Sequence, residues 1–320
     1  MEELPGGLRR VTMPLPSRPG HVHCYLLPVD DGFMLVDTGL GLPDAAELWA
    51  AELDQLPGPV STIFITHFHP DHLGATADVR ELTGARVVQG RLDAEQSAMT
   101  WKSEEWASHL AGWFRSNGVP DEVTKELLLQ GELFRPFIRP VLDPDLVDDG
   151  DHLHGWEIVA APGHADGQLT LLKDGVLIAA DHLLLRITPT VGLWPASRPD
   201  PLGDYLGSLQ RTIDLAPTIA YSGHGETVTD PVGRAKELIA HHAERLLVTA
   251  AAIGSQPRTA YEVSFPLFGD DLRKTRLAAI SPVTAATLTE LGFGPAIVAV
   301  TYTTEGLIDA ILAAECGKAE

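Results

Sequence analysis

Residues 66–72 read THFHPDH and place three histidines and an aspartate directly after the apolar run VSTIFI. This run predicts a short buried strand, and ionisable side chains at the end of a buried strand are costly unless a partner compensates them. Imidazole and carboxylate groups are the ligands that zinc and related divalent ions take in proteins. The loop therefore predicts a metal site, with His67 and His69 directed to one side and Asp71 and His72 to the other, which suits two ions.

Further side chains of the same kind follow three later apolar strands. His164 stands in APGHADGQ, Asp181 in LIAADHLL and His224 in YSGHGE, each at the exit of its strand. A single histidine is more often a surface or core residue than a ligand, but a whole set at strand exits is hard to explain that way. Because strand exits converge in α/β layers, we expect these side chains to meet the THFHPDH loop.

Strand patterns and helix patterns alternate along most of the chain, which predicts α/β layers. Strands are predicted within 22–37 around a turn at 30–32, at 60–66, at 85–90, within 154–181 and near 218–224, and helices at 43–56, 72–84, 202–215 and 231–254. Residues 91–140 carry Trp101, Trp106 and Trp113 without strand patterns. We interpret them as a helical insertion.

The pattern of the sequence changes near residue 255, just before the segment PRTAYEVSFPLFG. Helix, strand and helix patterns follow, with a strand at PAIVAV and an optional earlier strand at LAAI. We therefore predict a catalytic domain over 1–254, with the insertion at 91–140, and a small C-terminal domain over 255–320. That small domain is expected to be winged-helix-like or α/β.

Taken together, these motifs resemble the metallo-β-lactamase-fold hydrolases over about residues 20–250. LVDTG, the HxHxDH loop and the three later ligands occur in the order typical of that family. The resemblance implies an αββα sandwich that binds two divalent ions, zinc in the first place, with iron or manganese as alternatives. It assigns one ion to His67, His69 and His164, the other to Asp71, His72 and His224, the bridging position to Asp181, and a ligand-orienting role to Asp37. A turn residue is an equal alternative for Asp37.

One position departs from the family pattern. Ala180 stands where the family usually has glycine before the bridging aspartate. The extra methyl group should not remove the ligand. His182, directly after Asp181, is expected to be a polar neighbour rather than a ligand.

The branches of the family differ in their fit. True β-lactamases usually lack an aspartate like Asp181, and the NPFLR-like segment of glyoxalase II is missing. The segments PGHADGQLTLLKDGVLIAADHLL and YSGHGETVTDP are most similar to the β-lactamase-like protein 2 branch, which includes single-strand ribonucleases. The tail ISPVTAATLTELGFGPAIVAVTYTTEGLIDAIL resembles instead the terminal segment of uroporphyrinogen-III synthase.

Three functions remain open at this point. The first is a hydrolase in which a metal-bridging hydroxide attacks the carbonyl of a thioester, ester or lactone, with Asp71 and His224 as catalytic residues. The second is a phosphodiesterase or single-strand ribonuclease, and the third is a non-catalytic, metal-stabilised binding module. With 44 acidic against 23 basic residues, the formal charge is −21, which disfavours a nucleic-acid substrate and favours a small molecule.

Candidate substrate contacts lie in two regions. Trp194 and Arg186 follow Asp181 in a Pro-rich loop, where the arginine, like Arg198, has a charge suited to an acidic group. Trp106 and Trp113 are seven residues apart and share a helix face. That face either packs in the core or covers the metal site as an apolar lid.

The remaining features of the sequence concern the location of the protein in the cell, its disulfides and its oligomeric state. No apolar run reaches the roughly 20 residues of a membrane helix, and the first residues show no signal-peptide pattern, so we expect a cytoplasmic protein without a membrane partner. Cys24 and Cys316 are too few and too far apart for a disulfide framework. A homodimer is compatible with the sequence.

Overall fold

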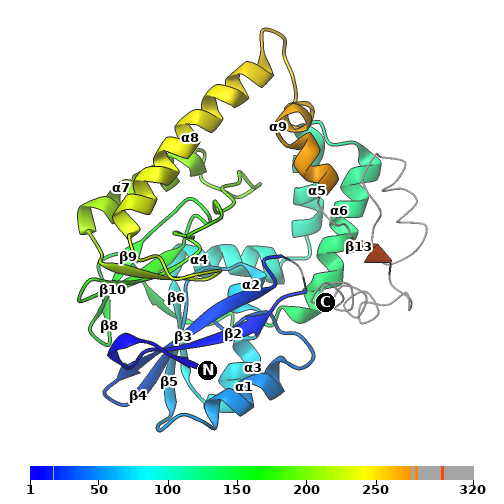
Figure 1. The fold of residues 1–320 in the computed structure, drawn as a ribbon. Helices are drawn as coiled ribbons and strands as arrows, with labels where there is room; N and C mark the ends of the chain where they lie inside the picture. The colour runs from blue at the N-terminus through cyan, green and yellow to red at the C-terminus, as the bar shows by residue number, and fades with distance from the viewer. Residues whose placement is uncertain (17, 275–277, 280–296, 299–320) are drawn as a thin grey trace, which may run out of the picture. The chain divides into compact units, whose positions relative to one another are not determined.

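The computed structural model of the chain describes residues 1–16, 18–274, 278–279 and 297–298. Among these residues, seven strands form one sheet in the order β1-β2-β3-β4-β5-β6-β7, and five form a second sheet in the order β12-β11-β10-β9-β8 (Figure 1). The first sheet consists of β1 (Glu2–Glu3), β2 (Arg9–Pro14), β3 (His21–Val29), β4 (Gly32–Val36), β5 (Val60–Ile65), β6 (Arg86–Gly90) and β7 (Asp145–Val147). The second consists of β8 (His152–Leu153), β9 (Trp156–Ala160), β10 (Leu169–Lys173), β11 (Val176–Ala180) and β12 (Ile219–Ser222).

Helices connect and cover these strands. They are the short 3-10 turn η1 (Pro5–Gly7), α1 (Ala45–Leu53), α2 (Pro70–Leu73), α3 (Thr76–Thr83), α4 (Arg91–Ser97), the π-helical turn η2 (Ala98–Lys102), α5 (Trp106–Ser116), α6 (Asp121–Phe134), the 3-10 turn η3 (Arg135–Phe137), α7 (Pro201–Leu215), α8 (Pro231–Ile253) and α9 (Ala260–Lys274). One helix was predicted over 72–84, but the structure has two, α2 and α3, because the chain turns between them at Gly74 and Ala75. Its predicted end is correct, since Gly84 caps α3 with a left-handed φ of 69°.

Side chains that alternate along the strands build the core between the sheets. Val36 of β4 and Phe64 of β5 belong to the same buried cluster as Ile178 of β11 and Tyr221 of β12. The two sheets therefore pack face to face through these residues. The hydrophobic effect of burying this cluster fixes the distance between the sheets, and with it the distance between the strand ends that carry the candidate ligands.

The alternate residues of the second sheet face outward, toward helices. Leu177 and Ala220 belong to a separate buried cluster with Tyr205 of α7 and Leu238 of α8. On the first sheet, α3 packs on β5 and α1 packs on α3. Helix, sheet, sheet and helix follow one another as layers, which confirms the predicted αββα sandwich.

Strand direction decides where the site forms. β4 and β5 pair in parallel, and so do β11 and β12. Parallel neighbours end at the same edge of a sheet, so the loops after these strands start side by side. His67 and His69 follow β5, Asp181 follows β11 and His224 follows β12, whereas His164 follows β9, which pairs in antiparallel with its neighbours.

The described chain divides into two compact units. The first contains residues 1–15, 19–110 and 135–242, and the described residues of the second lie within 16–18, 111–134 and 243–320. Within the second unit, Tyr261 N donates a hydrogen bond to the Asn117 carbonyl at 3.1 Å. The Arg245 guanidinium lies over the Phe268 ring at 5.1 Å. The predicted domain boundary at 254/255 stays a prediction.

Most of the predicted C-terminal elements fall outside the described residues. Two short strands are described there, β13 (Ala278–Ala279) and β14 (Ile297–Val298), and they pair in parallel. They coincide with the strands predicted at LAAI and PAIVAV. Cys316 and the helix predicted beyond residue 300 are outside the described residues, whereas Cys24 is buried in β3. No helix in the described part of the chain has the length and apolar character to cross a membrane.

Candidate metal centre

The loop after β5 divides its ionisable side chains by its own local structure. Thr66 follows the buried strand, and its backbone N–H and hydroxyl both donate to the Asp37 carboxylate at 2.8 Å. Pro70 then begins the single-turn helix α2, a position where proline costs no hydrogen bond. His67 and His69 therefore precede the helix, and Asp71 and His72 lie within it.

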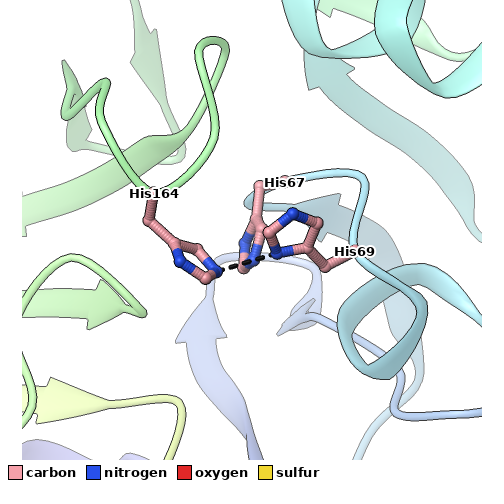
Figure 2. A group of neighbouring side chains, drawn as sticks. All are labelled: His67, His69 and His164. Atoms are coloured by element: carbon pink, nitrogen blue, oxygen red, sulfur yellow. Dashed lines mark hydrogen bonds between the residues drawn. The ribbon is translucent and has the colours of Figure 1, made fainter. Parts of the chain in front are cut away.

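The first group of side chains consists of His67, His69 and His164 (Figure 2). His69 Nδ1 lies 2.8 Å from His164 Nε2, and the ring centroids of His67 and His69 are 4.7 Å apart. His164 Nδ1 donates to the Thr190 carbonyl at 2.7 Å, so the lone pair of this ring is on Nε2. His67 Nδ1 donates to Thr66 Oγ1 at 3.0 Å, and its Nε2 is likewise left as an acceptor.

Burial keeps these three rings neutral. Desolvation is the main cause that lowers the pKa of His67 well below its ordinary value. The same cause lowers the pKa of His69 to about 3 and also lowers the pKa of His164. Neutral imidazole is the form that binds a metal ion. The first group is therefore already in the required protonation state at neutral pH.

The second group consists of Asp71, His72 and His224. His72 Nδ1 donates to Asp37 Oδ2 at 2.7 Å, and His224 Nδ1 donates to the His21 carbonyl at 2.7 Å. Both Nε2 atoms then point to carboxylates, with His224 Nε2 at 3.2 Å from Asp71 Oδ2. Burial opposes charge on His224, but its hydrogen bonds to Asp181 and Asp71 raise its pKa to about 10.

Asp181 lies between the two groups. Its Oδ2 is 3.5 Å from His164 Nε2 and 3.2 Å from His224 Nε2, and its Oδ1 is 3.5 Å from His72 Nε2. A Cβ atom at Gly223 would come within 2.4 Å of Asp181 Oδ1 and 2.9 Å of His72 Cε1. The chain therefore needs glycine before His224 for the carboxylate and the imidazole to share this space.

Buried polar atoms without partners show that this donor set fits divalent ions. Among the described residues, His67 Nε2, His72 Nε2 and Asp181 Oδ1 are buried and have no hydrogen-bond partner. An orphaned buried polar atom costs about 1–3 kcal/mol, so such atoms call for a ligand. Imidazole nitrogens and carboxylate oxygens on all sides match the ligand preferences of zinc and its neighbours.

Asp37 acts both on the backbone and on the ligands. Asp37 directly follows β4 and has a left-handed backbone, with a φ of 59°. Aspartate and asparagine tolerate this conformation better than most residues do. The Asp37 carboxylate accepts from Thr66 and from His72, and Thr66 in turn accepts from His67. One carboxylate thus fixes the tautomers of a histidine in each group.

Sequence reasoning missed the residues that hold the backbone of the loop after β5. Asp93, at the start of α4, accepts from Phe68 N at 3.0 Å and from Gln89 Nε2 at 2.6 Å. Trp101 Nε1 donates to the Phe68 carbonyl at 2.9 Å. The peptide groups between His67 and His69 are therefore held on both sides. No local pattern in the sequence marks Asp93 for this role.

An apolar cavity of about 270 Å³ opens beside the first group. His69 and His164 form part of its wall, together with Trp101, Trp106 and Trp194. Because tryptophan supplies large apolar surface, this wall suits an organic group better than a hydrated ion. All the lining residues belong to the first compact unit.

Comparison with known proteins now places this site in a family. The family model described as "Metallo-beta-lactamase superfamily" matches residues 17–224. The chain belongs to the metallo-β-lactamase superfamily. A solved metallo-beta-lactamase family protein from Thermus thermophilus is 35% identical, with a TM-score of 0.74 over 83% of this chain and 88% of that chain.

Curated relatives agree with this assignment. A "Probable metallo-hydrolase" of Bacillus subtilis is 28% identical over 81% of this chain and 84% of its own length. A "Beta-lactamase-like protein 2 homolog" of Drosophila melanogaster is 24% identical over 69% of this chain and 64% of its own length. An "Atrochrysone carboxyl ACP thioesterase" of Claviceps purpurea is 22% identical over 88% of this chain and 80% of its own length. The chain is thus a metal-dependent hydrolase of the superfamily, as the motifs predicted.

A second family model, "Uroporphyrinogen-III synthase HemD", matches residues 236–309. This agrees with the resemblance seen in the tail, and extends it back into α8. The match covers less than a quarter of the chain and says nothing about the metal centre, since its residues all follow His224.

The other residues that the sequence singled out in this metallo-β-lactamase superfamily member, as a neighbour of the ligands or as substrate contacts, make different interactions. His182 turns away from the ligands, and its Nε2 bonds with Thr212 Oγ1 at 2.7 Å. Arg186 forms an exposed ion pair with Glu226 at 3.0 Å, and Arg198 pairs with Asp204 at 3.0 Å. Trp113 lies in the second compact unit, whereas Trp106 belongs to the first.

Proposed function

We propose that the protein is a dinuclear metal hydrolase that cleaves a thioester, ester or lactone of a small molecule. His67, His69 and His164 would hold one ion, Asp71, His72 and His224 the other, and Asp181 would contact both. Two divalent ions there, zinc in the first place, would act as Lewis acids and bring the pKa of a bound water toward neutrality. Iron or manganese suits the same ligands.

The residues of the chain have separate tasks in this proposal. Burial alone would raise the pKa of Asp71, but His72 and His224 beside it lower that pKa to about 2. Asp71 is therefore ionised at neutral pH and would orient the attacking water by accepting a hydrogen bond from it. His224, held by the His21 carbonyl, presents its Nε2 beside the same carboxylate, so both side chains are placed to hold the second ion.

The observation that carries the choice of substrate is the tryptophan-lined cavity next to His69 and His164. A cleaved bond at the metal ligands would place an attached acyl group in this cavity. Its apolar wall lowers the free energy of a bound hydrocarbon or ring by removing it from water. The relative named as an acyl-carrier-protein thioesterase supports the same class of substrate.

Nucleic acid is disfavoured as a substrate. The formal charge is −21, and a nuclease of this kind would need a basic track for the phosphates. The two arginines considered as contacts for an acidic group, Arg186 and Arg198, both face carboxylates at 3.0 Å, so neither supplies such a track. We therefore place phosphodiester cleavage behind carbonyl hydrolysis, and a purely metal-stabilised binding module behind both.

The test combines metal analysis with a substrate panel. Metal per chain is measured on the purified protein, which is then assayed with an acyl thioester, a lactone, a bis-aryl phosphodiester and a short single-stranded RNA. Two ions per chain with thioester or lactone turnover are expected. Cleavage of RNA or of the phosphodiester alone would replace this proposal by the nuclease alternative. Failure to bind metal after reconstitution would remove its basis.

A further inference from the structure

The wall of the apolar cavity includes a carboxylate that carbonyl hydrolysis does not use. Asp166 lines the cavity, is only 8% exposed, and lies two residues after His164. Its Oδ2 accepts from Gln96 Nε2 at 2.8 Å and from the backbone N of Arg198 at 2.8 Å. Its Oδ1 accepts no hydrogen bond from any described residue.

Gln96 adds a second acceptor at the same place. It also lines the cavity and is 7% exposed. The Nε2 of Gln96 donates its hydrogen bond to Asp166. The Oε1 of Gln96 is buried and has no hydrogen-bond partner among the described residues. The two acceptor atoms at this place in the wall, Asp166 Oδ1 and Gln96 Oε1, would match a ligand group that is a donor or a cation.

No positive side chain of the described residues balances this carboxylate. The cavity wall contains no lysine or arginine, and the structure shows no ion pair of Asp166 in the part of the chain it describes. The Arg198 guanidinium points instead to Asp204. A nearly buried carboxylate without a counter-charge is costly, and a cationic ligand would remove that cost.

Three tryptophans complete the environment. Trp101, Trp106 and Trp194 all line the same cavity. The face of an indole ring carries negative electrostatic potential and is the best aromatic partner for a cation, above all for an alkylated ammonium group. Aromatic faces together with one carboxylate form the kind of wall that binds quaternary ammonium ions, which are apolar on the outside and charged within.

We propose that this cavity selects substrates whose acyl part ends in an ammonium group, held between the tryptophans and the Asp166 carboxylate. The inference rests on the proposed function for the position of the cleaved bond, while the cation site itself depends only on the cavity. The acyl chain would run from the ligands His69 and His164 to Asp166. A spacer of several carbons keeps the ammonium group away from the metal ions, whose charge would repel it.

A binding measurement tests the cation site independently of hydrolysis. Calorimetry compares choline with 3,3-dimethyl-1-butanol, which replaces the nitrogen by carbon and has almost the same shape. Choline is expected to bind at least about tenfold more tightly, as a desolvated cation–π contact with a carboxylate implies. Equal affinities, or tighter binding of the alcohol, would overturn the inference.

Substitutions locate the effect. Asp166→Asn is expected to abolish the preference for choline, and Trp194→Leu to reduce it without abolishing it. Asp143→Asn serves as the matched control, because it removes the same charge from a residue whose side chain is 83% exposed and pairs with Arg80. A preference that survives Asp166→Asn, or that Asp143→Asn reduces equally, would contradict a specific site.

A matched pair of substrates separates this inference from the proposed function. The N-acetylcysteamine thioesters of 4-(trimethylammonio)butanoate and 5,5-dimethylhexanoate differ only in nitrogen against carbon at the branch. We expect kcat/KM to be at least about tenfold higher for the cationic thioester, and Asp166→Asn to bring the ratio near one. Equal turnover would reject the ammonium preference and leave the hydrolase proposal intact. Choline binding without any thioester turnover would reject that hydrolase activity and leave the cation site.

Discussion

The two ligand groups of the metal centre differ in their surroundings. His67, His69 and His164 have lowered pKa values and stand beside an apolar cavity. His72 and His224 have raised pKa values, because carboxylates surround them in spite of burial. In the proposed function, the first group would face the organic part of the substrate, and the carboxylates of the second group would balance the charge of the two ions. Four predictions test this contrast.

The largest effect is expected where the two groups join. Asp181→Ala removes the side chain within 3.5 Å of histidines of both groups, so bound metal and activity should be lost together. Loss of the Lewis acids costs several kcal/mol of transition-state stabilisation, which is a rate decrease of at least about a thousandfold. Metal analysis and kcat/KM check this, with the exposed Asp143→Ala as control. A variant with two ions and full turnover would show that the ligand assignment is wrong.

A smaller effect is expected from the residue that orients both groups. Asp37→Asn keeps a residue that tolerates the φ of 59° but cannot accept from Thr66 and His72 as a carboxylate does. Loss of such an orienting partner typically costs about 10–100-fold in metal affinity. Competition with a chelator measures it. Asp37→Ala should bind metal no more tightly than Asp37→Asn. Its free energy of unfolding should be lower than that of Asp37→Asn, because the left-handed backbone costs alanine about 1–2 kcal/mol. Unchanged affinity in Asp37→Asn would leave Asp37 as a turn residue only.

The third prediction concerns the support beneath the loop and its dependence on pH. Burial raises the pKa of Asp93 from 3.8 to about 7, so between these values the folded protein keeps a proton that the unfolded chain releases. The free energy of unfolding therefore receives a contribution that falls as pH rises through this window. Asp93→Asn should lose this slope. Urea unfolding of both proteins between pH 4 and pH 7, at about 1 unit steps, measures it. Parallel curves would show that Asp93 does not titrate in this range.

The smallest effect is expected at Ala180. This alanine ends β11 with a φ of 44°, in the left-handed region that costs a non-glycine residue about 1–2 kcal/mol. Ala180→Gly removes that strain but adds about 0.5–1 kcal/mol of backbone entropy in the unfolded state. A net stabilisation of up to about 1.5 kcal/mol should follow, measurable by urea unfolding. Ala180→Val is the contrasting variant, because a β-branched side chain makes the strain larger. Destabilisation by glycine would contradict this account.

The strands and the candidate ligands were predictable because each leaves a local signal. VSTIFI is apolar without interruption, as a buried strand requires, and the ligands follow such runs directly. The roles of Asp93, Trp101 and His21 were not predictable, since they act on peptide groups far away in sequence: Asp93 and Trp101 hold Phe68, and His21 binds His224 through its carbonyl. The break between α2 and α3 was missed because the residues around Gly74 also fit one continuous helix.

Ala180 shows the same limit in another form. From sequence, the missing glycine amounts to one extra methyl group near a ligand. The structure shows instead that the position requires a left-handed backbone, so the methyl group acts on chain conformation and not on the ligand. The register of the parallel pairing of β11 with β12 shifts between Ile178 and Ala180, and counting one extra methyl group does not reveal this.

The candidate ligands come from both sheets, so bound ions would make the centre a reversible cross-link. His67 follows β5 of the first sheet and His224 follows β12 of the second, so an ion shared through Asp181 would join distant points of the chain. In a polymer, closing such a long loop costs entropy that grows with the logarithm of its length. Ions that bind only the folded chain offset this cost through mass action. The supply of metal in the surroundings would then set how firmly the two halves of the sandwich hold together, as well as whether the site can react.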